Sequence, residues 1–173
     1  MFATIYLPNF YLQAALRHQT ELAGKPVALI DDQAPKAVII QLNQAAEEGG
    51  VRLGMTPSQG LARRLSLVVK TRVRAQEKLL GELLLHFGYT LAPYVEATGP
   101  GVCTVQFTDM KNALQNVTRV VEQLHEASVT AQAGIAHTPD ASLLAAHLAK
   151  PVLLVDDGKD FLGPLPIETL AIA

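Results

Sequence analysis

Apolar residues along this chain fall into short runs bounded by turn residues, a pattern typical of β-strands. The first run ends at Pro8, and three of the later ones are followed directly by Asp31, Asp109 and Asp156. The pattern predicts strands at residues 2–7, 27–30, 37–42, 67–70, 94–97, 102–108, 129–135 and 152–155.

Other segments repeat apolar residues every three or four positions, which is the spacing of one helix face. The longest covers residues 73–89, another begins at Asp109, and a third runs over 138–148. Shorter helices are predicted after Asn9, over 44–48 and after Thr56, because asparagine and threonine favour the N-cap position. The order of these elements indicates an α+β fold of ferredoxin-like type, with a mixed or antiparallel sheet and helices on one face.

Composition narrows the class of protein. Of the 173 residues, 49% are hydrophobic and 17% are charged, which excludes a disordered chain. The net charge of −2 lacks the basic surplus of a strong, sequence-independent DNA binder, although a local basic face remains compatible with it. The single cysteine, Cys103, excludes an intrachain disulfide, and no signal peptide or membrane-spanning run is present. We therefore expect a soluble, cytoplasmic protein.

Side chains with metal-binding chemistry form no recognisable motif. The acidic pairs at 31–32 and 156–157 each follow an apolar run, where a turn explains them. The 5 histidines lack metal-ligand spacing, so we expect no metal site and no cofactor. Basic residues gather at two places where they could contact a DNA backbone, the alternative being a solvated face. The candidate DNA-binding residues are Arg63, Arg64, Lys70, Arg72 and Arg74.

Five stretches of the chain resemble, in order, the palm and fingers of Y-family translesion DNA polymerases. They read NFYLQAAL, LAGKPVALIDD, EEGGVRLGM, HLAKPV and FLGPLPIETL. The resemblance implies a discontinuous palm-like domain at 1–14 and 75–166 and a small α/β fingers-like subdomain at 15–74. It also implies that 167–173 begin a thumb that this chain lacks, as in an N-terminal fragment.

The chain departs from this family where the palm holds magnesium. The family uses three acids to bind two magnesium ions, and hard cations of this kind require oxygen ligands. The positions that match those acids are Tyr6, Gly101 and Val102, none of which supplies a carboxylate. The resemblance therefore implies a degenerate catalytic site without bound metal.

The nucleotide pocket departs as well. Gln44 and Glu47 stand where the family has a tyrosine and an arginine, and a carboxylate would repel a triphosphate. What remains of the family's nucleotide contacts is Lys150 and the aromatic pair Phe10-Tyr11. For the aromatic pair, packing in the core is the alternative.

These departures resemble the ImuB-type branch of the family. That likeness implies a protein that is not an enzyme and acts as an adaptor in SOS-induced translesion DNA synthesis and mutagenesis. The implied partners are a C-family type translesion polymerase, the sliding clamp and a recombinase, bound mainly through a C-terminal part outside this chain; contact with damaged DNA would be weak. Two alternatives stay open: an active Y-family polymerase with displaced metal ligands, and a generic α+β protein-binding module.

Overall fold

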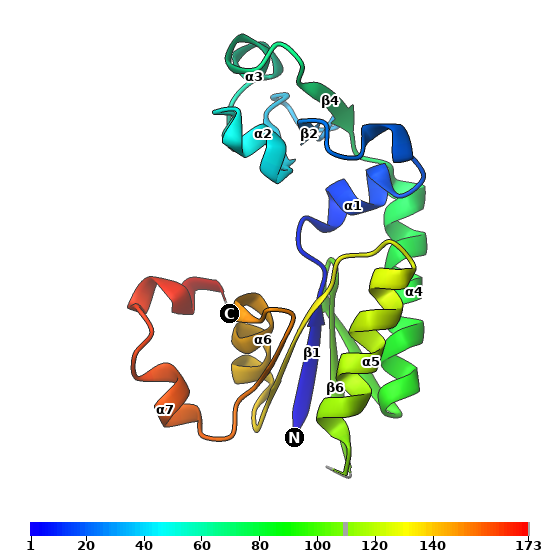
Figure 1. Ribbon diagram of the computed structural model, residues 1–173, viewed down its shortest axis with the longest axis vertical. Helices are drawn as coiled ribbons and strands as arrows, with labels where there is room; N and C mark the ends of the chain where they lie inside the picture. Colours follow the sequence, from blue (N-terminus) through cyan, green and yellow to red (C-terminus); the bar gives the residue numbers. More distant parts are fainter. Residues whose placement is uncertain (109–110, 173) are drawn as a thin grey trace. The chain divides into compact units, whose positions relative to one another are not determined.

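The computed structural model describes residues 1–108 and 111–172, with side chains described as far as residue 169. The chain divides into two compact units. Unit 1 comprises Met1–Pro8 and Leu80–Ala173, and unit 2 comprises Asn9–Leu79. Unit 2 is therefore an insertion that follows the first strand of unit 1 (Figure 1).

Unit 1 is built on a mixed sheet. Its strands are β1 (Phe2–Tyr6), β5 (Tyr94–Gly99), β6 (Val102–Gln106), β7 (Gln132–Ala136) and β8 (Val152–Leu154). They lie in the order β5-β6-β1-β7-β8. β1 is central and pairs antiparallel with both β6 and β7, whereas β8 pairs parallel with β7. Ile5, Val105 and Ile135 are fully buried, so the sheet carries the core of this unit.

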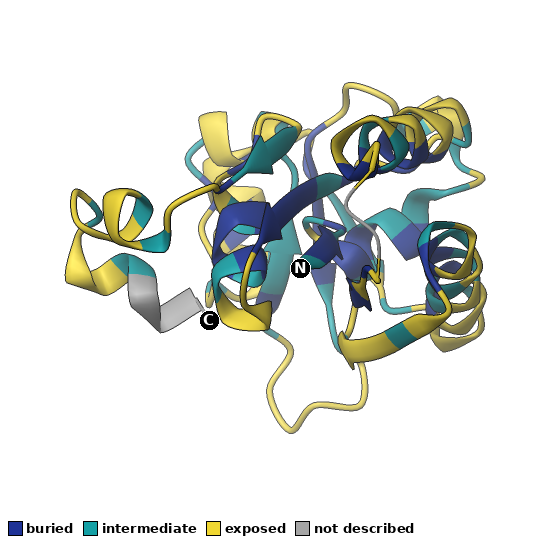
Figure 2. Ribbon diagram, turned by 90° about the horizontal axis from the view of Figure 1, so that it is seen from below, coloured by how far each residue is buried: buried dark blue, intermediate teal, exposed yellow. Residues whose placement is uncertain are grey.

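Helices cover both faces of this sheet (Figure 1). They are α4 (Arg74–Leu91), α5 (Ala113–Glu126), α6 (Pro139–Leu148) and the short α7 (Gly158–Leu162), followed by a 3-10 turn at Ile167–Ile172. A Cβ added to Gly88 of α4 would lie 2.7 Å from Cys103 Sγ, and one added to Gly134 of β7 would meet the backbone of α6. Cys103 pairs with Ile5 and Gly134 with its neighbour Thr4, so α4 and α6 lie on opposite faces. Figure 2 shows buried strands beneath helices whose outer sides are exposed.

Unit 2 contains a smaller sheet in the order β3-β2-β4. Its elements are α1 (Phe10–Leu16), a 3-10 turn (Thr20–Leu22), β2 (Val27–Ile30), β3 (Ile39–Leu42), α2 (Gln44–Glu48), α3 (Pro57–Arg63) and β4 (Val68–Thr71). One apolar cluster joins Val27 and Leu29 to Leu12 of α1. A second joins Ala28 and Ile39 to residues that follow them in the chain. The alternation along β2 thus gives the sheet two buried faces.

Polar caps set the starts of two helices in unit 2. The Asn43 side chain accepts a hydrogen bond of 3.1 Å from Ala46 N and holds the start of α2. Thr56 and Gln59 form a reciprocal capping box at the start of α3. The Thr56 cap was expected from the sequence, whereas Asn9, the other expected cap, makes no side-chain cap hydrogen bond at the start of α1.

The expected α+β class with a mixed sheet is confirmed, but four details differ. The helices do not all lie on one face, because glycine at 134 lets α6 pack closely on the second face. The helix expected from Asp109 begins at Ala113 after Asn112, and Asp109 itself lies outside the described residues. The structure also contains α7, which no apolar periodicity predicted. The unit boundaries fall a few residues from the expected 14/15 and 74/75, so that α1 and the start of α4 belong to unit 2.

Candidate functional site

The positions expected to form a degenerate catalytic site meet at one edge of the sheet in unit 1. Tyr6, at the end of β1, lies opposite Val102 of β6 and Gln132 of β7. Leu7 N donates to Gly101 O at 2.8 Å, which continues the pairing beyond the strand end. Gly101 has φ +72°, a conformation that glycine adopts without strain and that closes the turn into β6.

An aromatic contact occupies this strand end. The Tyr6 ring lies 3.9 Å from the imidazole of His147, measured between centroids and tilted by 34°. Burial raises the pKa of the Tyr6 hydroxyl and lowers the pKa of His147, so both rings favour their neutral forms. Lys150 lies in the connection between α6 and β8 and is exposed. Gln132 Nε2 donates to Ala149 O at 3.0 Å and fastens this connection to β7.

We tested whether the strand end fits the magnesium ions that the fold family implies. Magnesium prefers carboxylate oxygens. Here the side chains are a neutral phenol at Tyr6 and an isopropyl group at Val102, while Gly101 has none. Within residues 1–108 and 111–172, no group of three His, Cys, Asp or Glu side chains could hold a metal ion. These residues do not fit the two ions.

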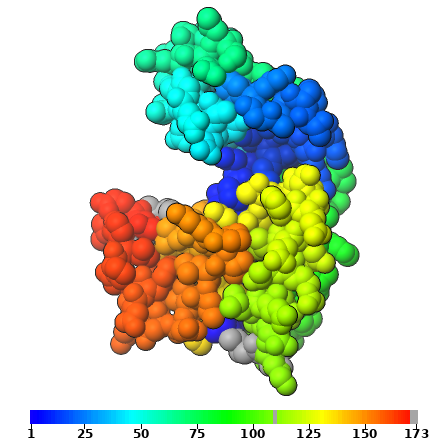
Figure 3. Space-filling model, viewed as in Figure 1, coloured from blue at the N-terminus to red at the C-terminus, as the bar shows by residue number. Residues whose placement is uncertain are grey.

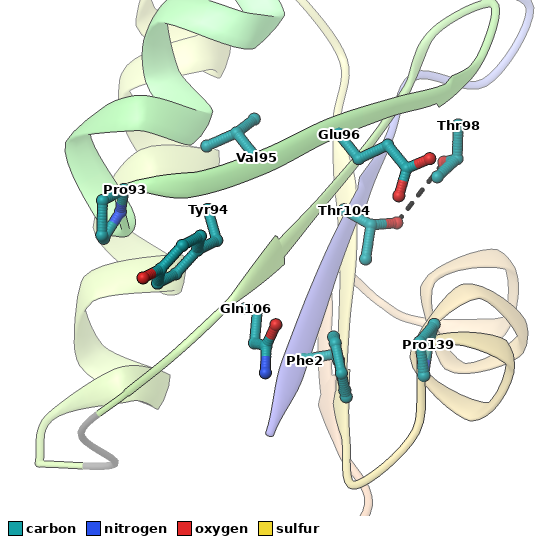
Figure 4. A pocket seen from close by; sticks show the side chains of 9 residues that line it. All are labelled: Phe2, Pro93, Tyr94, Val95, Glu96, Thr98, Thr104, Gln106 and Pro139. Carbon is teal, nitrogen blue, oxygen red and sulfur yellow. Dashed lines mark hydrogen bonds between the residues drawn. The ribbon is translucent and has the colours of Figure 1, made fainter.

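The face of the sheet that packs against α6 also carries an open pocket of about 450 Å³. Figure 4 shows its lining, in which Tyr94, Glu96 and Thr98 come from β5 and Thr104 and Gln106 from β6, with Phe2, Pro93, Val95 and Pro139 around them. Glu96 contributes the single carboxylate of this lining and is exposed. The pocket therefore offers mainly hydroxyl and amide groups.

Beneath the pocket runs a chain of buried hydroxyls. Thr4 Oγ1 lies 3.0 Å from Thr104 Oγ1 and 2.7 Å from Ser142 Oγ. Because Ser142 donates its only proton to Pro139 O at 2.7 Å, Thr4 must donate to Ser142, and Thr104 must donate to Thr4. These side chains tie β6, β1 and α6 together. Sequence reasoning missed them, although the threonines occupy inward positions of their strands.

In unit 2, Arg72 is the centre of an ion-pair network. Its guanidinium forms bonds of 2.8 and 2.6 Å to the two oxygens of Glu77 and one of 3.1 Å to Asp31. It also stacks on the Tyr11 ring, 3.8 Å from the centroid. Arg74 donates to both oxygens of Asp31 at 2.9 and 3.1 Å. The network explains why the Arg72 pKa is raised, first by its bonds to Glu77.

The remaining residues predicted to bind DNA or nucleotide in unit 2 take no part in these ion pairs, although the Phe10 ring centroid lies 5.5 Å from that of Tyr11. Arg63 and Arg64 are exposed at the end of α3, and Lys70 is half-buried on β4. Phe10 is 7% exposed and therefore packs in the core. Glu47 lines a pocket of about 440 Å³ with Asn9, Leu42, Val51, Arg52 and Leu53.

Comparison with solved structures identifies the fold. The chain superposes on the insertion ternary complex of Dbh DNA polymerase with a TM-score of 0.86, at 16% identity, covering 99% of this chain and 54% of that one. DinB from Sulfolobus solfataricus gives a TM-score of 0.84, at 16% identity, covering 97% and 52%. The fold is that of the palm and fingers region of Y-family DNA polymerases.

The sequence assigns the family. The model of the impB/mucB/samB family matches residues 5–147, and the chain belongs to this family. A DNA polymerase IV of Pseudomonas savastanoi pv. phaseolicola is 29% identical over 177 residues, covering 93% of this chain and 48% of the relative. A DNA polymerase IV of Legionella pneumophila is 26% identical over 175 residues with the same coverage. The chain thus spans about half the length of the curated relatives it matches.

These findings correct one expectation. The departures at Tyr6, Gly101 and Val102 implied a protein that is not an enzyme. The relatives are named DNA polymerase IV, and the structural neighbours are DNA polymerases, so the comparisons point to an enzyme and that expectation is wrong. The resemblance to the Y family is confirmed.

In the described part of the chain, no helix is both long and apolar enough to cross a membrane.

Proposed function

We propose that this chain supplies the palm and fingers of a Y-family DNA polymerase that acts in translesion DNA synthesis. The observation that carries the proposal is the family match over residues 5–147 on a fold shared with Dbh DNA polymerase. In this assignment unit 1 is the palm, unit 2 is the fingers, and residues 167–173 lead into a thumb.

The proposed activity requires metal ligands that are displaced from the strand end at Tyr6, because the side chains there do not fit magnesium. Glu96 is the carboxylate that lines the open pocket next to α6, in register with Thr104. We propose a displaced role for Glu96 because cross-strand pairing through Thr104 and Thr4 places it on the same face of the sheet as Tyr6.

For DNA contact we propose Arg63, Arg64 and Lys70. Their cations have no ion-pair partner in the described part of the chain. Arg72 and Arg74 form ion pairs with Asp31 and Glu77. Because these carboxylates partly neutralise the two cations, Arg72 and Arg74 attract a phosphate more weakly.

Primer extension by the complete protein encoded by the gene tests the proposal. With undamaged and abasic templates, and magnesium or manganese present, we expect templated addition of nucleotides. Glu96→Gln should lower the rate while primed DNA still binds, because glutamine keeps the shape but loses the charge. A complete protein that binds primed DNA but adds no nucleotide would overturn the proposal, whereas extension unaffected by Glu96→Gln would overturn only the role of Glu96.

The second candidate is an adaptor role of the ImuB type in SOS-induced synthesis. The absence of carboxylates at Tyr6, Gly101 and Val102 favours it, since recruitment needs no metal site. Its partners would be a C-family type polymerase, the sliding clamp and a recombinase. Purified complete protein should then bind at least one of these directly in a size-exclusion assay, and binding to none would eliminate this role.

A further inference from the structure

A third pocket lies at the end of α5 in unit 1. It has a volume of about 550 Å³ and is mostly apolar. Val121 and Ala131, 4% and 6% exposed, form its floor together with Pro151. In Figure 3 the yellow end of α5 lies beside the orange segment around residue 150. The pocket is large enough for the tip of an aliphatic side chain.

The rim of this pocket is acidic. Glu122 and Glu126 lie one helical turn apart on α5, and both are exposed. Neither carboxylate has an ion-pair partner within residues 1–108 and 111–172. The lining includes no lysine or arginine. The pocket is therefore complementary to an apolar tip flanked by cations.

The chain itself carries such a tip. Leu65 is 91% exposed, the highest value among the large hydrophobic residues of the described part of the chain. It follows α3 in a turn closed by the hydrogen bond from Leu67 N to Arg64 O, at 2.9 Å. Arg63 and Arg64 directly precede it, and both are exposed. Leu65 therefore presents an apolar tip beside two cations, which matches the apolar lining and acidic rim of the pocket.

We propose that Leu65 of one copy inserts into the acidic-rimmed pocket of a second copy. The side chains of Arg63 and Arg64 would then face Glu122 and Glu126. Each copy has one tip and one pocket, so a pair held by a single contact keeps a free tip and a free pocket to which further copies can add. The small contact makes the association weak and dependent on concentration. The inference goes beyond the proposed function and needs no DNA.

Sedimentation of the chain, without DNA, tests this contact between about 10 and 500 µM. We expect the average mass to rise from 18.6 kDa through that of two chains and beyond. Leu65→Ser, and separately Glu122→Lys with Glu126→Lys, should each keep the protein monomeric. The matched controls are Leu114→Ser, another exposed leucine, and Glu21→Lys, an exposed acid outside both surfaces. They should assemble like the wild type.

Mixing the two deficient variants gives the sharpest readout. The Leu65→Ser variant retains an intact pocket and the lysine variant an intact tip, so the mixture should form heterodimers and nothing larger. Adding Arg63→Glu and Arg64→Glu to the lysine variant should restore assembly by reversing both charges. A wild type that stays monomeric throughout, or a mixture that forms no heterodimer, would overturn the proposal.

Discussion

At the scale of single residues, Arg72 shows how the fold can give a basic residue partners that its own stretch of sequence does not reveal. The sequence places it in a basic stretch, but only the fold brings Asp31 and Tyr11 to it from distant positions. No local sequence pattern predicts such a contact between residues that are distant in the chain. The stacked pair Tyr6 and His147 was hidden from the sequence for the same reason.

Removing the Arg72 guanidinium should destabilise the chain. Arg72→Met leaves Glu77, whose side chain is 10% exposed, without its partner, and we expect unfolding to become easier by about 2–3 kcal/mol. Arg74→Met is the control, because the Arg74 side chain is 44% exposed and its loss should cost less than about 1 kcal/mol. Urea denaturation measures both. Equal losses would show that burial does not decide the effect.

Asp31 should make stability depend on pH. The Gln33 N–H, and then Arg74 and Arg72, lower the pKa of its carboxyl in the folded chain. The Asp31 carboxylate therefore contributes its full share to the free energy of unfolding above its ordinary pKa of about 4. This contribution is lost as the pH falls through the lower pKa that the carboxyl has in the folded chain. We expect Asp31→Asn to lower the urea midpoint at pH 6 and to flatten its fall towards pH 2.5, roughly the range in which the carboxyl takes up its proton. Parallel curves for both proteins would contradict this.

At the scale of elements, the sequence predicted most strands and helices within a few residues. Apolar runs and caps are local signals, and they sufficed for the β2–β3 pair and for α2 and α3. The face on which α6 packs was not predictable, because its helix is apolar over most of its surface and lacks a polar side that would orient it. The residue that determines this packing is in β7, where Gly134 leaves room for the backbone of α6.

Alanine substitutions at two glycines should change stability in opposite directions, one through close packing and the other through helix propensity. Gly134→Ala should destabilise the chain by more than about 3 kcal/mol, because its methyl group would meet the α6 backbone. Gly81→Ala, in α4 with nothing within 4 Å of the added carbon, should stabilise it by about 0.5–1 kcal/mol. Thermal unfolding of the two variants checks the signs. A neutral Gly134→Ala would show that α6 can move away from the sheet.

At the scale of the whole molecule, net charge limits what this chain can do with DNA. With a charge of −2, only a local cluster can attract phosphate. If Arg63, Arg64 and Lys70 make the contacts, the logarithm of the binding constant for primed DNA should fall with the logarithm of salt with a slope of about −2 to −3. Arg63→Gln with Arg64→Gln should reduce that slope by about 2. Fluorescence anisotropy measures it, and an unchanged slope would place the contacts elsewhere.

The insertion of unit 2 has an experimental consequence. Only two covalent crossings, Pro8 to Asn9 and Leu79 to Leu80, join it to the remainder. Cutting a gene at these codons would allow the intervening cassette to be exchanged for that of another family member. Such chimaeras would test whether properties of the protein follow unit 2 or the remainder of the chain.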